Sequence, residues 1–182
     1  MLLLSRIAGI FFIFGCGTLL HHLFKWSGRS RLVAPVAPVN ESLWEHFKMF
    51  LWPGLLIAPL EYALVGREHP GFAAGTAAGL LLMPLATALG FYAYTAVLGR
   101  HVLALDIALF LVAVVAGQLT GHLVMTEMRP HTWMQFAGVA ALTLMVVLHA
   151  VTTFRPPRFG LFRDPVRDCY GIPDEPGLDT GP

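Results

Sequence analysis

Residues 40–48 read Asn-Glu-Ser-Leu-Trp-Glu-His-Phe-Lys, and a long apolar run follows them at once. This segment, called the polar motif below, contains two carboxylates, an imidazole, an amide and an ammonium. Ionisable groups at a membrane boundary are costly unless they are paired or used. The polar motif is therefore the point from which the rest of the chain is best interpreted, and the first place to look for a functional site.

The composition is that of a membrane protein. Of the 182 residues, 56% are hydrophobic and 13% are charged, which is about half the charged share of an average soluble domain. The lipid bilayer is thus the first expected partner. A net charge of +1 provides no basic field for phosphates, so nucleic acid is excluded as a partner. The two cysteines, Cys16 and Cys169, imply no disulfide framework.

Five apolar segments are expected to cross the membrane as helices. The second begins in the polar motif, where Ser42 and Glu45 match a capping box. The sequence predicts an all-α integral membrane protein: a five-transmembrane-helix bundle over residues 1–154 with a short polar, Pro/Arg-rich tail over residues 155–182. The expected spans are residues 7–24, 49–65, 72–98, 102–125 and 132–154.

The distribution of basic residues predicts the orientation of this bundle. With five crossings, nine Lys and Arg residues fall on one side and three on the other, so the first side is expected to be cytoplasmic. The N-terminus is then outside and the C-terminal tail inside. The nine are Lys25, Arg29, Arg31, Lys48, Arg100, Arg155, Arg158, Arg163 and Arg167, and the three are Arg6, Arg67 and Arg129.

The same topology gathers imidazoles and carboxylates from separate helices near the cytoplasmic side. Such convergence is typical of a metal site in a helix bundle, and also of a proton relay or a polar substrate pocket. The expected cofactor of the metal interpretation is a divalent ion such as zinc. The candidate catalytic residues are Glu41, Glu45, His46 and Asp106; the candidate metal ligands are His46, Asp106, His21 and His149; further polar candidates are Asn40, Trp44, Lys48, Tyr92 and Glu61.

Each candidate also has a structural interpretation. Glu45 and Lys48 follow Glu41 at helical spacing, so the three are also expected as intrahelical partners. His149 has apolar neighbours and is equally expected as a hydrogen-bonded core residue. Glu61 is expected to pair with Arg6 across the first two helices. A tyrosine such as Tyr92 near a span end fits the interfacial belt.

The third span carries small residues at a spacing that favours close helix packing. Gly75 and Gly79 are four apart, which lets helix backbones approach closely in lipid. A homo-oligomer through this helix is therefore expected.

Two stretches carry a resemblance. The polar motif followed by Trp52-Pro53, together with the tail from Arg155-Pro156-Pro157 through Asp164-Pro165 to Tyr170-Gly171-Ile172, resembles a family of small bacterial multipass membrane proteins, the domain-of-unknown-function family 6512. Tyr92, Tyr94, Gly99, Asp106 and Ile107 fit its middle section. The resemblance implies a location in the bacterial inner membrane and supplies no activity.

Three functions remain open at this point. The first is a small metal-assisted intramembrane enzyme acting on a lipid or other membrane-soluble substrate, with a metal that activates water. The second is a transporter or permeation subunit lined by proline-kinked helices. The third is a non-catalytic membrane assembly partner. No zincin, nucleophile-elbow or P-loop signature is present to decide among them.

Overall fold

The computed structural model describes residues 1–128 and 131–173. Arg129 and Pro130, which lie in a predicted turn, fall outside the described residues, and Arg129 is one of the residues in the charge count. Residues 174–182 of the predicted tail also fall outside them.

The described residues are mostly helical, and four helices are long and apolar enough to cross a membrane. This composition fits a membrane protein. The predicted second span forms a fifth helix, α3 (Lys48–Leu64), but its 17 residues are fewer than in any of the other four. The count of five crossings therefore stays a prediction. The four are α1 (Leu2–Trp26), α4 (Phe72–Leu98), α5 (Leu103–Thr126) and α6 (Thr132–Phe154).

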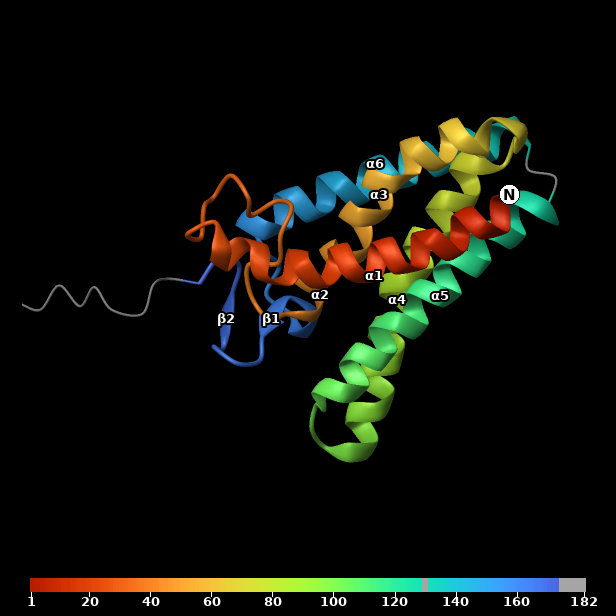
Figure 1. Ribbon diagram of the computed structural model, residues 1–182. Helices are drawn as coiled ribbons and strands as arrows, with labels where there is room; N and C mark the ends of the chain where they lie inside the picture. Colours follow the sequence, from red (N-terminus) through yellow and green to blue (C-terminus); the bar gives the residue numbers. More distant parts are fainter. Residues whose placement is uncertain (129–130, 174–182) are drawn as a thin grey trace, which may run out of the picture.

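Helices α1, α3 and α6 run between two ends of the molecule (Figure 1). The N-terminus and the C-terminal end of α5 lie at one end, called the N-terminal end. Residues 27–42 and the described tail, residues 155–173, lie at the other, called the tail end. Helix α3 runs back from the tail end alongside α1, and a short 3₁₀ turn (Gly66–Glu68) leads from it into α4. The α4–α5 hairpin projects from the bundle.

The polar motif starts a helix as predicted, but the helix is divided. Ser42 is the N-cap of a short helix, α2 (Leu43–His46), and its side chain accepts a hydrogen bond from the Glu45 amide at 3.4 Å. At Phe47 the amide bonds to the carbonyl of Trp44, three residues back, and α3 begins at the next residue. Only half of the predicted capping box forms, because the Glu45 carboxylate accepts from the Val39 amide instead of the Ser42 amide.

Helix α4 is the central helix. In its most apolar window 39% of the residues are buried, against 22–28% in the other three candidate spans. Side chains of α4 and of the helices packed against it form an apolar layer in the middle of the bundle. This layer separates the polar groups of the two ends. The buried members of this layer are Ile13, Phe47, Phe50, Leu80, Met83, Ala113 and Val114.

Glycines bring α4 and α5 into backbone contact. A Cβ atom on Gly79 would lie 2.5 Å from the carbonyl oxygen of Gly117, and one on Gly75 would lie 2.7 Å from that of Gly121. The close approach predicted from the Gly75–Gly79 spacing is thus made inside the chain. A homo-oligomer through α4 would have to use its other residues.

The described tail folds against the bundle and contacts the polar motif through Asp164 and the carbonyl of Gly171. A 3₁₀ turn, η2 (Gly160–Phe162), leads into an antiparallel hairpin of β1 (Arg163–Asp164) and β2 (Cys169–Tyr170). Arg163 pairs with Tyr170, and Asp164 pairs with Cys169. Within the hairpin, Asp164 is fully buried.

Replacing Gly79 with alanine tests the α4–α5 contact. The added methyl would overlap the Gly117 carbonyl, so Gly79→Ala should lower the free energy of unfolding by about 1–3 kcal/mol. The measurement is unfolding of the detergent-solubilised protein by a denaturing detergent, followed by circular dichroism. Gly15→Ala is the control, because a Cβ there meets no atom within 4 Å. Equal stability of the two variants would contradict the packing.

Candidate functional site

The inward side of the polar motif forms a buried ion pair. Lys48 is fully buried, and its ammonium donates to the Glu45 carboxylate at 2.6 Å and to the Thr153 hydroxyl of α6 at 2.6 Å. It also donates to the carbonyl of Ala34 at 2.8 Å. The same Glu45 oxygen accepts from the Val39 amide at 3.0 Å. Every charge in this group has a partner, so the pair serves to fix the connection between α1 and α2.

Two further motif residues attach the motif to α6 and the tail. Asn40 accepts from the Ser42 amide and donates to the carbonyl of Gly171 at 2.7 Å. The Trp44 indole donates to the Thr152 hydroxyl at 2.7 Å. Its ring stacks on the His149 ring with their centroids 4.5 Å apart, and the centroid of the Phe162 ring of the tail is 4.7 Å away. These side chains therefore hold elements together.

The outward side of the polar motif meets the end of α1. The ligand atoms of His21, Glu41 and His46 lie within 4.8 Å of one another. Nε2 of His46 is 3.5 Å from the Glu41 carboxylate, and Nε2 of His21 is 4.0 Å from it. The side chains are 29% exposed for both histidines and 48% for Glu41. Within residues 1–128 and 131–173, no other group of three His, Cys, Asp or Glu side chains comes this close.

The hydrogen bond of His46 determines its free ring nitrogen. Nδ1 lies 2.8 Å from the carbonyl oxygen of Ser42, and a carbonyl can only accept, so Nδ1 carries the proton. In the neutral ring Nε2 is then a lone pair that faces a carboxylate oxygen. Two acceptors at 3.5 Å repel each other unless a cation, either a proton on Nε2 or a metal ion, lies between them. A backbone carbonyl on the second ring nitrogen is typical of histidines that bind metals.

The spacing of these ligands suits a small divalent ion. Bonds of about 2 Å in a tetrahedral site place ligand atoms about 3.3 Å apart. The His46–Glu41 distance of 3.5 Å is already close to this value, the His21–Glu41 distance is 4.0 Å, and all three ligand atoms lie within 4.8 Å of one another. Two histidines and a glutamate form one of the known ligand sets of catalytic zinc, with the fourth position left to water. The exposure of Glu41 keeps that position accessible from outside the bundle.

The other two predicted metal ligands lie elsewhere. Asp106 is in the α4–α5 hairpin, where its carboxylate accepts a hydrogen bond from Tyr94 and faces His101 at 3.6 Å. His149 lies under Trp44, and its Nδ1 donates to the carbonyl of Met145 at 2.9 Å. Neither residue belongs to the group formed by His21, Glu41 and His46.

The remaining two polar candidates have structural surroundings. Glu61 forms the predicted pair with Arg6, at 3.2 Å, near the N-terminal end. Arg6 also donates to Gln118 of α5 at 3.4 Å. Beside this group is a cavity of about 10 Å³, close to the room that one water molecule needs. Tyr92 is 49% exposed and contacts Phe91 edge to face.

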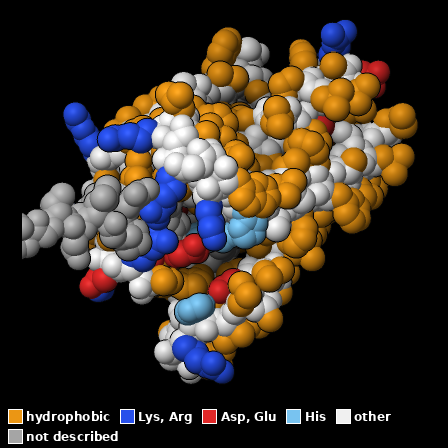
Figure 2. Space-filling model, turned by 60° about the vertical axis from the view of Figure 1, so that its left-hand side comes forward, with side chains coloured by type: hydrophobic (Ala, Val, Ile, Leu, Met, Phe, Trp, Pro, Cys, Tyr) orange, Lys and Arg blue, Asp and Glu red, His pale blue; other side chains and the backbone are white. Residues whose placement is uncertain are grey.

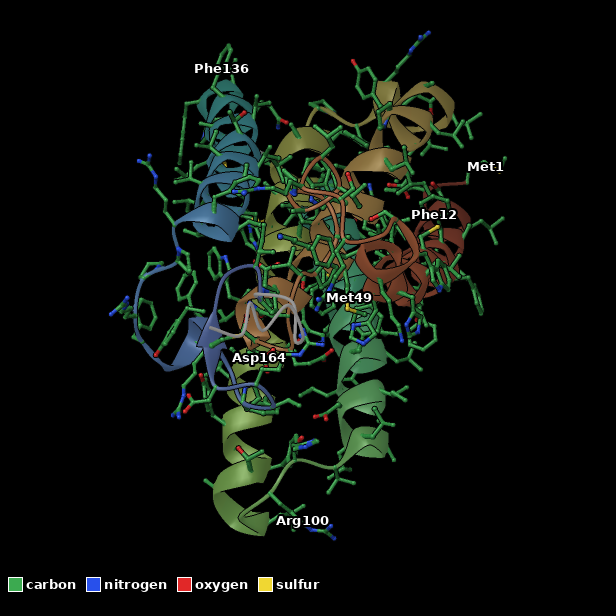
Figure 3. All side chains as sticks on the ribbon, turned by 90° about the vertical axis from the view of Figure 1, so that its left-hand side faces the viewer. Met1, Phe12, Met49, Arg100, Phe136 and Asp164 are labelled. Carbon is green, nitrogen blue, oxygen red and sulfur yellow. The ribbon has the colours of Figure 1, made fainter. Side chains whose placement is uncertain are left out.

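The histidine–glutamate group opens on the tail end. Figure 2 shows Lys and Arg side chains gathered around acidic and histidine side chains on this face, while hydrophobic side chains cover the part that extends away from it. Figure 3 views the same end: Asp164 lies at the centre beside the polar motif, and Arg100 marks the tip of the α4–α5 hairpin. The group thus lies at the end of the bundle where basic and histidine side chains are exposed.

Two residues of this region, Thr153 and Asp164, have important contacts but were not assigned a role from the sequence. The Thr153 hydroxyl accepts a hydrogen bond from the Lys48 ammonium. Nothing in the sequence at the apolar end of α6 distinguishes Thr153 from other threonines. Asp164 accepts from the amide of Glu41 at 3.2 Å and from the amides of Val166 and Arg167 in its own turn. The Asp-Pro pair at positions 164 and 165 was a usable signal for that turn, although not for its contact with Glu41.

Comparison with known proteins identifies the family. Residues 4–172 match the model of the Family of unknown function (DUF6512), so the chain belongs to this family. The match covers the polar motif, helices α2 to α6, all but the first two residues of α1, and the described tail hairpin. No curated protein and no solved structure matches the chain.

The buried ion pair can be tested by removing its cation. Lys48→Met leaves the Glu45 carboxylate buried without its partner, which should cost about 3–5 kcal/mol of unfolding free energy. Lys25→Met, at an exposed lysine at the end of α1, should change it little. The double variant Lys48→Met/Glu45→Leu should recover part of the loss, because no unpaired charge remains. Denaturing-detergent titrations of the three variants measure this, and equal stability of the two single variants would contradict the proposed role of Lys48.

Proposed function

We propose that this member of the family is a membrane-embedded metalloprotein that holds a divalent ion such as zinc with His21, Glu41 and His46. The observation that carries the proposal is the convergence of three ligand atoms within 4.8 Å at the tail end. The Nε2 lone pair of His46, directed at the Glu41 carboxylate, supports it. Asp106 and His149 are not part of this ligand set.

The chemistry that fits the site is hydrolysis of an ester in a membrane-soluble substrate. A metal with one open position lowers the pKa of a bound water to about 7 and polarises a carbonyl or phosphoryl oxygen. In this hydrolysis a water oxygen would bond to the acyl or phosphoryl centre, the bond to the alcohol oxygen would break, and that oxygen would take up a proton from solvent. Glu45 is not available as the base, because Lys48 and the Val39 amide occupy its carboxylate. The proton from water therefore passes to solvent.

The position of the site favours a lipid-like substrate. His21 is close to the end of an apolar helix whose outer side chains, such as Phe11 at 74% exposure, face the surroundings of the bundle. On this face Lys and Arg side chains gather around acidic and histidine side chains (Figure 2), and such surfaces attract anionic headgroups. A substrate lying in the membrane could thus bring its headgroup to the metal without leaving the lipid.

A permeation path is less well supported by the same geometry. The polar groups of the two ends are the Lys48–Glu45 pair and the Arg6–Glu61 pair. Between them lies the apolar layer around Phe50, Leu80 and Met83. An ion or polar solute would have to cross this layer without a polar partner, which is costly in the membrane interior.

The proposal includes an orientation. We place the chain in the bacterial cytoplasmic membrane with five crossings, α3 being the shortest, the N-terminus outside and the tail in the cytoplasm. Lys48 and Arg6 are buried and paired, so the positive-inside bias rests on the exposed basic residues of the tail end, including Arg31, Arg158 and Arg163.

Zinc binding by the purified protein tests the metal site. The wild-type protein in mild detergent should bind about one zinc ion per chain, and His46→Ala should bind at least tenfold more weakly, because one of the three protein ligands is gone. Titration against a chromophoric zinc chelator gives the affinity, and elemental analysis gives the stoichiometry.

The control for this test is His131→Ala, an exposed histidine before α6, which should bind zinc like the wild type. The catalytic step is tested separately, by zinc-dependent release of water-soluble product from a bacterial lipid extract. A wild-type protein that binds no zinc would contradict the metal site, and the His46–Glu41 contact would then be an ion pair with protonated histidine. Zinc binding without product release would contradict the hydrolase alone.

Reporter fusions test the five crossings. A reporter that is active only in the cytoplasm should be active after residue 182 and inactive before residue 1, because an odd number of crossings places the chain ends on opposite sides. A fusion within Gly66–Glu68 should behave like the N-terminal one, since α3 would return the chain to that side. Both chain ends on one side would mean that α3 does not cross, leaving four spans.

A further inference from the structure

The three ligands of the proposed site are held in different ways. His21 lies on the long helix α1. His46 lies on α2, and its ring is fixed by the Ser42 carbonyl. Glu41 lies before the N-cap of α2, outside any helix. Its backbone is therefore positioned by contacts from elsewhere, and one of these comes from the tail.

Asp164 makes that contact. Its carboxylate is fully buried and accepts three backbone amides: Glu41 at 3.2 Å on one oxygen, and Val166 at 2.8 Å and Arg167 at 3.1 Å on the other. Hydrogen bonds from amides to a carboxylate are among the stronger ones in proteins. One oxygen thus shapes the tail turn, and the other attaches the turn to a proposed metal ligand.

We infer that Asp164 is a positioning residue for Glu41, and that docking of the tail and binding of the metal strengthen each other. The inference rests on the proposed function, because it concerns the same metal site. Asn40 supports it from the neighbouring position, since its side chain donates to the Gly171 carbonyl of the tail. The two bonds attach consecutive motif residues to the tail segment 164–171, so release of the tail frees the Glu41 backbone.

The coupling must act in both directions. If tail docking raises the affinity for the metal by some factor, the metal raises the stability of tail docking by the same factor. Outer-shell residues of metal sites typically contribute 10- to 100-fold to metal affinity. A metal-loaded site should therefore keep the tail on the bundle, and an undocked tail should weaken the site without removing any ligand.

Asp164→Asn tests the inference with little change in shape. The amide group retains one oxygen, which can still serve the Val166 and Arg167 amides, and places a donor against the Glu41 amide. In the full-length protein, zinc affinity should fall about tenfold. Asp168→Asn is the matched control, because Asp168 lies in the same hairpin, is exposed and pairs with Arg163; it should leave zinc affinity unchanged.

A second pair of variants separates positioning from general damage. In a Glu41→Ala background, Asp164→Asn should weaken the remaining zinc binding no further, because the ligand that Asp164 positions is absent. An equal tenfold loss in both backgrounds would show that Asp164 acts on the site in another way, and would overturn the inference.

Limited proteolysis of the wild type provides a measurement that needs no variant to fold. Trypsin can cut at the exposed Arg158, Arg163 and Arg167 of the tail, and zinc should slow these cuts several-fold. Cutting at the exposed Arg67, at the N-terminal end, is the internal reference and should not change.

The outcomes distinguish the two proposals. Zinc binding by the wild type with no protection of the tail, or with unchanged affinity in Asp164→Asn, overturns the coupling and leaves the metal site standing. Absence of zinc binding by the wild type overturns the metal site, and the coupling with it.

Discussion

The buried ammonium of Lys48 is the constraint on which the tail end of the molecule depends. A fully desolvated cation must be surrounded by acceptors, and here these come from three separate segments. Glu45 belongs to the polar motif, Ala34 and Ala37 to the α1–α2 connection, and Thr153 to α6. Satisfying one charge therefore fixes the relative positions of all three. The connection, which has little regular structure, is held by this charge as well as by apolar contacts around Phe24.

A second buried pair has a comparable role at the N-terminal end. Arg6 joins α1 to Glu61 of α3 and to Gln118 of α5. Between the two pairs the helices pack through apolar side chains and through the glycine contact of α4 with α5. In lipid, apolar surface alone gives little preference for one arrangement of helices. The two ion pairs and the glycine contact provide the directional interactions that select this one.

The sequence predicts where the helices lie along the chain better than it predicts which side chains point into the bundle. Length and hydropathy locate α1, α4, α5 and α6, and the residues at the start of the motif predict the Ser42 cap. The pairing of Glu61 with Arg6 also follows from charge and depth. In a membrane, however, both the lipid-facing and the inward side of a helix are apolar, so periodicity does not say which way His149 or Asp106 points.

The candidate site shows a second limit of sequence reasoning. Glu41, Glu45 and Lys48 have the spacing of one helical face, and they would share it if a single helix began at Asn40. Instead, α2 begins after Ser42, so Glu41 lies outside the helix while Glu45 and Lys48 turn inward. The Glu41 amide donates to Asp164, 123 residues further along the chain. A contact of that range depends on the packed tertiary structure, which local spacing does not encode.

A buried ion pair seldom stabilises a fold more than apolar side chains of the same volume, so its presence calls for another explanation. Lys48 and Glu45 fix the backbone on both sides of Glu41 and His46, through Val39 before them and through α3 after them. The side chains of Glu41 and His46 point to the outward side of the polar motif, where they meet His21 of α1. A site whose ligands must meet within a few tenths of an ångström requires such a rigid support. The inward half of the polar motif thus supports the backbone, and the outward half carries Glu41 and His46, two of the three ligands in the proposed metal site.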